Sequence, residues 1–244
     1  MALIKTIITL VLFFTISLVF LLIAIPFYFI GLIGFKQEMG HIIYKLAQAV
    51  ARIGIFLTGC SMTVTGRENI PKKGRLCFVA NHVGLFDILL TAAYAGRAFG
   101  FIAKKELRAL PVYNLWILVL GGLFIDRKKP RKAIKTINLG INQIKRGGAM
   151  LIFPEGTRSR GQGIGPFLPG ALKLATQSEA LIVPIAISGS YEVFEKTYRV
   201  QSSRVSIHFL PPVNPMEIAL EDRKTFLAEK LHGNIAHILE QDNT

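Results

Sequence analysis

The apolar positions divide the chain into a long uncharged stretch, an amphipathic segment and a remainder with alternating patterns. Residues 6–35 carry no charged side chain, and an apolar run of this length is typical of a membrane-inserted helix. Residues 6–25 alone would extend roughly 30 Å as a helix, about the thickness of the hydrocarbon core. Pro26 then predicts a break or a kink. We expect membrane insertion, either as a single span ending near Pro26 or as a helical hairpin that enters one leaflet and returns.

The segment at residues 39–58 has the pattern of an amphipathic helix. His41, Lys45, Gln48 and Arg52 recur at helical spacing and fall on one polar stripe, while most other positions are apolar. Two interpretations are open. The helix could lie at the membrane interface with its basic stripe toward lipid phosphates, or it could pack on the rest of the protein. We expect residues 1–60 to form membrane-anchoring helices and residues 61–244 to form the functional domain.

From residue 61 onward, short apolar runs with β-branched residues alternate with segments of helical periodicity. We expect strands at residues 61–65, 76–80, 99–103, 123–125, 149–153, 181–188 and 205–210. We expect helices at residues 87–95, 131–145, 171–178 and 221–240. This alternation predicts an α/β fold, with a mixed sheet flanked by helices and preceded by the N-terminal membrane-associated helical segment.

The charge distribution points to an anionic partner. The 244 residues include 29 Lys and Arg against 15 Asp and Glu, a net charge of +14. Most of the excess lies between Phe101 and Arg160 and is densest at residues 127–135. Such a run is commonly a solvated surface, but several of these cations follow expected strands, where α/β folds bind ligands. Cys60 and Cys77 form neither a disulfide framework nor a metal motif, and no nucleotide-binding glycine pattern is present.

The first candidate for chemistry is a histidine followed by a carboxylate. The strand expected at residues 76–80 leads into His82, and Asp87 follows five residues later. On one helix this offset would separate the two side chains, but a strand that turns into a helix can bring them together. Asp87 would then accept the Nδ1 proton and leave Nε2 as a base. Alone, such a pair is more often structural, and no third ligand suggests a metal.

The second candidate is the polar segment at residues 153–159, directly after an expected buried strand. Gly156 lets the backbone approach a ligand closely, and Arg158 offers a planar fork for a phosphate. Thr157 supplies a hydroxyl, and Glu155 could hydrogen-bond a substrate hydroxyl. This density of polar groups favours a binding loop over a plain turn.

These motifs occur in a characteristic order. His82-x4-Asp87 is followed by residues 104–107, 122–127 and 153–159, and then by Val183-Pro184. In combination they resemble the glycerolipid acyltransferase family of the HX4D type, which includes the 1-acylglycerol-3-phosphate acyltransferases. The resemblance covers residues 64–210. One position departs from it, because the family often has Ser where this chain has Gly84.

The resemblance implies an enzyme that transfers a fatty acyl group from a thioester to the sn-2 hydroxyl of lysophosphatidic acid, forming phosphatidic acid. It implies His82 as the general base and Asp87 as the group that orients it, with no cofactor and no metal. The donor would be acyl-carrier protein or coenzyme A carrying the acyl chain. The other expected partners are anionic membrane lipids, not nucleic acid. The positive-inside tendency predicts the catalytic domain on the cytoplasmic side of the cytoplasmic membrane.

The resemblance also assigns the substrate-binding residues. Lys104 or Lys105, together with Arg127 and Arg158, would hold the acceptor's phosphate. Glu155 and Thr157 would position its glycerol, and backbone N–H groups near Gly156 would stabilise the oxyanion.

Two alternatives to this function are open. One is the same chemistry on another lysolipid acceptor. The other is a non-catalytic, membrane-bound basic lipid-binding protein, in which His82 and Asp87 would be dispensable. Trp116 and Tyr113 could line an acyl groove or serve ordinary packing.

Overall fold

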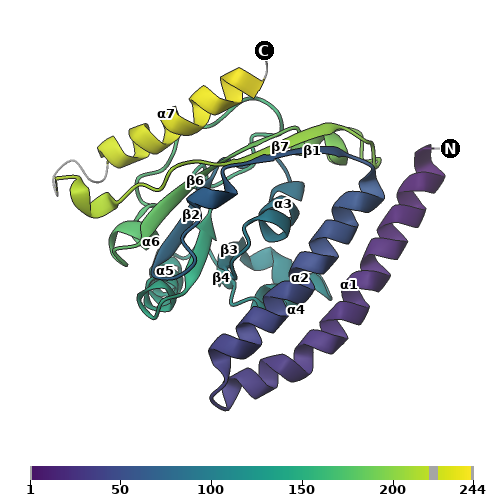
Figure 1. The fold of residues 1–244 in the computed structure, drawn as a ribbon, viewed down its shortest axis with the longest axis horizontal. Coiled ribbons are helices and arrows are strands. Elements are labelled where there is room, and N and C mark those ends of the chain that lie inside the picture. The colour runs from purple at the N-terminus through teal and green to yellow at the C-terminus, as the bar shows by residue number, and fades with distance from the viewer. Residues whose placement is uncertain (1, 220–224, 243–244) are drawn as a thin grey trace.

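The computed structural model describes residues 2–219 and 225–242 (Figure 1). Two N-terminal helices, α1 (Ala2–Leu32) and α2 (Lys36–Thr58), form an antiparallel hairpin beside a mixed α/β sheet. Helices cover both faces of this sheet, so the predicted fold class is confirmed.

The sheet has seven strands within the described residues, in the order β1-β7-β6-β2-β5-β3-β4. Their bounds are β1 (Ser61–Thr65), β2 (Leu76–Ala80), β3 (Gly100–Lys104), β4 (Leu123–Ile125), β5 (Ala149–Ile152), β6 (Leu181–Ser188) and β7 (Arg204–Phe209). Strands β6, β2, β5, β3 and β4 run parallel, whereas β7 is antiparallel to β6. The carboxyl ends of these five parallel strands therefore meet at one edge of the sheet.

Strand β2 is the centre of the sheet. Leu76 pairs with Ala149 of β5 on one side and with Leu181 of β6 on the other. All five β2 residues are buried, as its uninterrupted apolar sequence predicts for a central parallel strand. Alternate side chains enter opposite cores: Phe78 packs in the core beneath α2, and Cys77 in the core beneath the C-terminal helix.

The helices of the domain divide between the two faces. On the face of α2 lies α3 (Phe86–Tyr94), and α4 (Tyr113–Val119) packs against α1. The opposite core is formed with α5 (Pro130–Lys145), α6 (Lys173–Thr176) and α7 (Thr225–Asp242). The helix expected at 171–178 is shorter than predicted, and the start of the one expected at 221–240 lies outside the described residues. Helix α4 was not predicted, because its almost wholly apolar sequence has no helical periodicity.

Of the break or kink expected at Pro26, the break does not occur, so the alternative of a span that ends near Pro26 is wrong. Helix α1 continues through Pro26 to Leu32. A proline in an apolar helix removes one hydrogen bond, and packing against a neighbouring helix can compensate for the loss. Leu21 and Ala24, just before the proline, are buried against Ile43 and Ala47 of α2.

Part of the polar stripe on α2 serves to dock this helix on α3. The Gln48 side-chain amide donates to the Ala93 carbonyl at 3.0 Å, and Arg52 Nε donates to the same oxygen at 3.2 Å. A cation at the carboxyl end of α3 is electrostatically favourable. His41 and Lys45 remain exposed. The structure therefore favours the interpretation in which this helix packs on the rest of the protein.

Candidate active site

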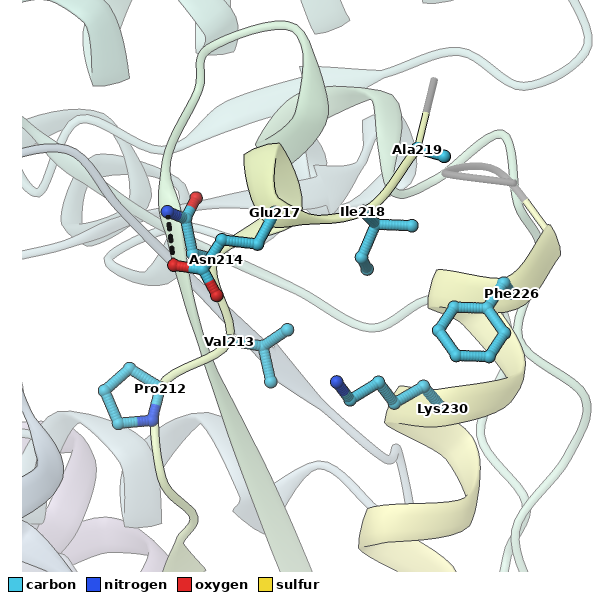
Figure 2. Close-up of a pocket in the computed structure, with 8 residues that line it drawn as sticks. All are labelled: Pro212, Val213, Asn214, Glu217, Ile218, Ala219, Phe226 and Lys230. Carbon is cyan, nitrogen blue, oxygen red and sulfur yellow. Dashed lines mark hydrogen bonds between the residues drawn. The ribbon is translucent and has the colours of Figure 1, made fainter. Parts of the chain in front are cut away.

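A cavity of about 470 Å³ beside α7 contains none of the predicted site residues in its described lining (Figure 2). That lining consists of parts of residues 212–219 with Phe226 and Lys230. Its Asn214 side chain donates to Glu217 at 3.0 Å, so these two polar groups satisfy each other. The candidate site lies instead at the carboxyl edge of the sheet.

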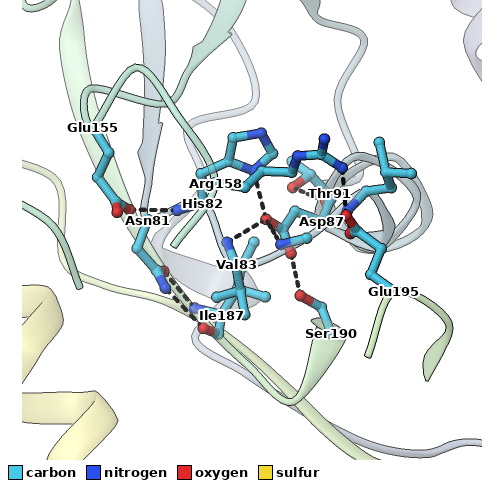
Figure 3. A network of polar contacts seen from close by, with 12 residues as sticks. Asn81, His82, Val83, Asp87, Thr91, Glu155, Arg158, Ile187, Ser190 and Glu195 are labelled. Atoms are coloured by element: carbon cyan, nitrogen blue, oxygen red, sulfur yellow. Dashed lines mark hydrogen bonds and ion pairs between the residues drawn. The ribbon is translucent and has the colours of Figure 1, made fainter. Parts of the chain in front are cut away.

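His82 and Asp87 meet at this edge, as the sequence predicts (Figure 3). His82 Nδ1 lies 2.7 Å from Asp87 Oδ2, and the aspartate side chain is fully buried. The same oxygen accepts the backbone N–H groups of Val83 at 2.7 Å and Gly84 at 3.0 Å, at the start of α3 where a carboxylate is favourable. The Ser190 hydroxyl donates to Asp87 Oδ1. The carboxylate is thus fixed by four donors, one of which is the imidazole.

The His82 ring is held without being closed off. Its side chain is 18% exposed and stacks on Phe153, with ring centroids 4.0 Å apart and an interplanar angle of 19°. Nδ1 is engaged by Asp87, whereas Nε2 has no hydrogen-bond partner among the described residues. This arrangement leaves Nε2 free to take a proton from a bound molecule.

Glu155 connects the loop after β5 to the segment after β2 that carries His82. Its Oε1 accepts the His82 N–H at 2.6 Å, and its Oε2 accepts the Gly165 N–H at 2.9 Å. Burial raises the pKa of this carboxyl above its ordinary value, although both N–H donors oppose the shift. The contacts in the structure are thus with backbone, and a contact between Glu155 and the substrate's glycerol stays a prediction.

The loop that carries the second motif runs beside the histidine loop. The Ser159 N–H donates to the His82 carbonyl at 2.7 Å, and the Arg160 N–H to the Val83 carbonyl at 3.2 Å. The Gly156 N–H is taken by the Phe153 carbonyl at 3.1 Å. Stabilisation of an oxyanion by backbone N–H groups near Gly156 stays a prediction. Thr157 is exposed.

The predicted phosphate-binding cations lie at or after the carboxyl ends of parallel strands that meet at this edge. Lys105 is paired with Asp126 at 2.9 Å, and this hydrogen bond raises the pKa of Lys105 and lowers that of Asp126. Arg127 Nη1 donates to the Gly156 carbonyl. Lys104, at the end of β3, is exposed. The structure brings these groups to one edge, and their substrate contacts stay predictions.

Three residues at the site were missed by sequence reasoning. Asn81 bridges β2 and β6, because its side chain donates to the Ile187 carbonyl at 2.9 Å and accepts the Ile187 N–H at 2.8 Å. Ser190 follows β6 in a Ser-Gly-Ser sequence, the same signal of polar residues after a buried strand. Glu195, which pairs with Arg158, lies in a segment without periodicity and had no signal.

An apolar cavity of about 440 Å³ adjoins the site, within the usual size range of ligand pockets. It lies between the α1–α2 hairpin, α3 and α4, and it reaches Leu85, Ser190 and Glu195. Trp116 and Tyr113 both line it. Trp116 is also packed, since its indole N–H donates to Ser17 Oγ at 3.0 Å. The two interpretations of this tryptophan are therefore compatible.

Within residues 2–219 and 225–242, no group of three or more His, Cys, Asp or Glu side chains is placed to hold a metal ion. Cys77 is buried in the core, and burial raises the pKa of its thiol. The chemistry that this edge offers is proton transfer by a carboxylate-held imidazole, with cations beside it.

The comparisons identify the class of protein. The family model described as Acyltransferase matches residues 61–188, more than half of the chain, so the chain belongs to the acyltransferase family. The resemblance predicted from the motifs is confirmed, and so is the assignment as an enzyme. The alternative of a non-catalytic lipid-binding protein is not supported.

Two relatives carry the same name. A 1-acyl-sn-glycerol-3-phosphate acyltransferase of Borreliella burgdorferi is 30% identical over 81% of this chain and 79% of its own length. The enzyme of the same name from Saccharomyces cerevisiae is 29% identical over 86% of this chain and 69% of its own length. The crystal structure of the 1-acyl-sn-glycerophosphate (LPA) acyltransferase PlsC from Thermotoga maritima has the same fold, with a TM-score of 0.84. It is 24% identical and covers 100% of this chain and 98% of that one.

Proposed function

We propose that this acyltransferase transfers a fatty acyl group from a thioester to the sn-2 hydroxyl of lysophosphatidic acid, forming phosphatidic acid. The observation that carries the proposal is the His82–Asp87 pair at 2.7 Å, in which Nε2 has no hydrogen-bond partner among the described residues. Leu85, on the same loop, lines an apolar cavity. The names of the relatives support the choice of acceptor.

The geometry of the pair supports a direct transfer with His82 as the general base. Asp87 holds the proton on His82 Nδ1, so that Nε2 is the basic nitrogen. Nε2 takes the proton of the acceptor hydroxyl as its oxygen attacks the thioester carbonyl. The C–S bond then breaks, and the leaving thiolate takes the proton back from the imidazolium. No acyl-enzyme is needed, and general base catalysis of this kind contributes on the order of 10²- to 10⁴-fold.

The cations at the same edge would bind the acceptor's phosphate. Arg127 donates to the Gly156 carbonyl, and Arg158 belongs to the same loop and pairs with Glu195. Lys104 is the last residue of β3, and Lys105 follows it. A guanidinium presents paired N–H donors that match phosphate oxygens. Thr157, exposed on the turn, would position the glycerol together with Glu155.

The apolar cavity would hold an acyl chain. It begins at Leu85 next to the histidine loop and continues between α1 and α2, along Phe13 and Val50. Apolar lining with a reactive polar group at one end is the usual form of a lipid-binding site.

Residues 1–60 would act as the membrane anchor and residues 61–244 as the acyltransferase domain. Among the described helices, α1 is the one long and apolar enough to cross a membrane. Its outer face exposes more apolar surface than a soluble monomer usually does, including Ile4, Ile7, Val11, Leu22 and Phe29. Because α2 runs alongside it with exposed charges such as Lys45, we infer that the hairpin enters one leaflet, which avoids burying those charges. The catalytic domain would face the cytoplasm.

The donor is proposed only as an acyl thioester of an anionic carrier, either acyl-carrier protein or coenzyme A. The exposed cations at the start of α5 support an anionic donor, because that turn has no acidic residue to offset Arg131 and Lys132.

The test is acyl transfer by the purified full-length chain, with both donors and a panel of lysolipid acceptors. We expect lysophosphatidic acid to be the preferred acceptor and phosphatidic acid the product. A preference for acceptors without a phosphate monoester would instead support the alternative of another lysolipid. No transfer to any lysolipid would overturn the proposal.

A further inference from the structure

Glu195 connects the second motif to the histidine loop. One carboxylate oxygen accepts from Arg158 Nη1 (Figure 3). The other accepts the backbone N–H of Leu85. The Glu195 side chain is 11% exposed and that of Arg158 is 28% exposed. Because the pair is partly buried, water and salt weaken its attraction less than at the open surface. Arg158 is therefore tied, through Glu195, to the loop that carries His82 and Asp87.

The space around Gly84 is shaped by the same carboxylate. A Cβ atom at Gly84 would lie 2.7 Å from Glu195 Oε2 and 3.3 Å from the Tyr191 Cα. A side chain at position 84 would thus displace Glu195 or the backbone behind it. The close fit indicates that the loop and Glu195 form one packed unit.

The ion pair uses only one edge of the guanidinium. Arginine has five N–H donors, and Glu195 engages Nη1. Within the described part of the chain, the Arg158 side chain has no other hydrogen-bond partner. Nε and Nη2 therefore remain as a pair of parallel donors, which is the arrangement that binds phosphate oxygens in bidentate fashion.

We propose that Glu195 is a positioning residue for the acceptor's phosphate. It fixes Arg158 so that Nε and Nη2 face the phosphate, and it sets the distance between that phosphate and His82 by holding both loops. This inference rests on the proposed function, since it takes lysophosphatidic acid as the ligand. Without Glu195, the long arginine side chain would have to be ordered on binding, at a cost in affinity.

The test is equilibrium binding of lysophosphatidic acid, without donor, to the full-length protein and to Glu195→Gln. An amide offers one acceptor where Arg158 and the Leu85 N–H both require one. We expect the Kd, and the KM in the transfer assay, to rise about five- to tenfold, with kcat within about twofold of wild type. Glu192→Gln is the matched control, because Glu192 is an exposed carboxylate of the same segment and pairs with Lys196 instead.

A double-variant comparison separates positioning from a general structural role. If Glu195 acts through Arg158, then Arg158→Ala and Arg158→Ala/Glu195→Gln should bind lysophosphatidic acid equally weakly. Equal affinity of wild type and Glu195→Gln would overturn the inference, as would a fall in kcat with unchanged KM. Should Glu195→Gln fail to fold, Glu195→Asp, which withdraws the charge from Arg158, carries the same comparison. Binding without acyl transfer would contradict the proposed function and leave this test intact.

Discussion

His82 is oriented by three contacts that come from two segments of the chain. Asp87 at the start of α3 holds Nδ1, Phe153 after β5 supports the ring face, and Glu155 holds the backbone N–H. The first of these contacts could be predicted, because the two residues lie close in sequence. The roles of Ser190 and Glu195 could not be predicted, because their partners Asp87 and Leu85 lie more than 100 residues earlier in the chain. Their contacts depend on the pairing of β2 with β6 in the sheet.

Glu155 gives a pH-dependent prediction. Because burial raises the pKa of this carboxyl in the folded protein, the folded state binds its proton more tightly than the unfolded state. The free energy of unfolding should therefore fall as the pH rises from the unfolded-state value of 4.5 through the raised folded-state value. Glu155→Gln lacks this titration. Denaturant unfolding of both proteins across this range should show the wild-type advantage shrinking as the pH rises, and an advantage that is constant or grows would contradict the account.

At the scale of elements, the sequence predicts strands better than helices. Strands β1, β2, β4 and β6 have the expected bounds, because short β-branched runs between turn residues are a local signal. Helix α1 continues through Pro26, although a proline ordinarily ends or kinks a helix, because α1 packs against α2 on both sides of this position. The short α4 is likewise set by the neighbours it packs against.

Asn81 links β2 to β6 through its side chain. Beyond the last paired residues, Ala80 and Ile185, its side chain continues the ladder by binding both backbone groups of Ile187. Asn81→Ala leaves a buried N–H and a carbonyl without this partner, and we expect a loss of about 2 kcal/mol or more in the free energy of unfolding. Asn69→Ala, which removes a single bond to the Phe209 carbonyl, should cost about half as much. Equal losses in denaturant unfolding would contradict this role.

At the scale of the whole molecule, the N-terminal hairpin is part of the candidate site. Thr6 accepts the Val200 N–H at 2.9 Å, and Ser17 accepts the Trp116 indole N–H. Helix α1 is therefore hydrogen-bonded to the α/β domain at two positions along its length. The hairpin also forms one wall of the apolar cavity. The sequence predicts membrane insertion of residues 6–35, but it contains no signal for the pairing of α1 with α2 or for this shared cavity.

Gly54 tests whether this cavity holds the acyl chain. A Cβ at Gly54 would lie 2.6 Å from the Phe13 ring, and both residues line the cavity. Gly54→Val should therefore push Phe13 into the cavity and shift the preferred donor to shorter chains, by about tenfold in the kcat/KM ratio of short to long donors. Gly40→Val on the same helix is the control, since a Cβ there meets no atom within 4 Å. An unchanged chain-length profile would place the acyl chain elsewhere.

The most direct test of the mechanism is the turnover of His82→Ala with lysophosphatidic acid and an acyl thioester, at saturating concentrations of both. His208→Ala is the matched control, because His208 is also paired with an aspartate, Asp242 at 3.0 Å, on another part of the sheet. We predict that kcat of His82→Ala falls by about 10²- to 10⁴-fold, while acceptor binding and the His208→Ala rate stay within about threefold of wild type. A His82→Ala enzyme that keeps near-normal kcat would contradict the assignment of this imidazole as the general base.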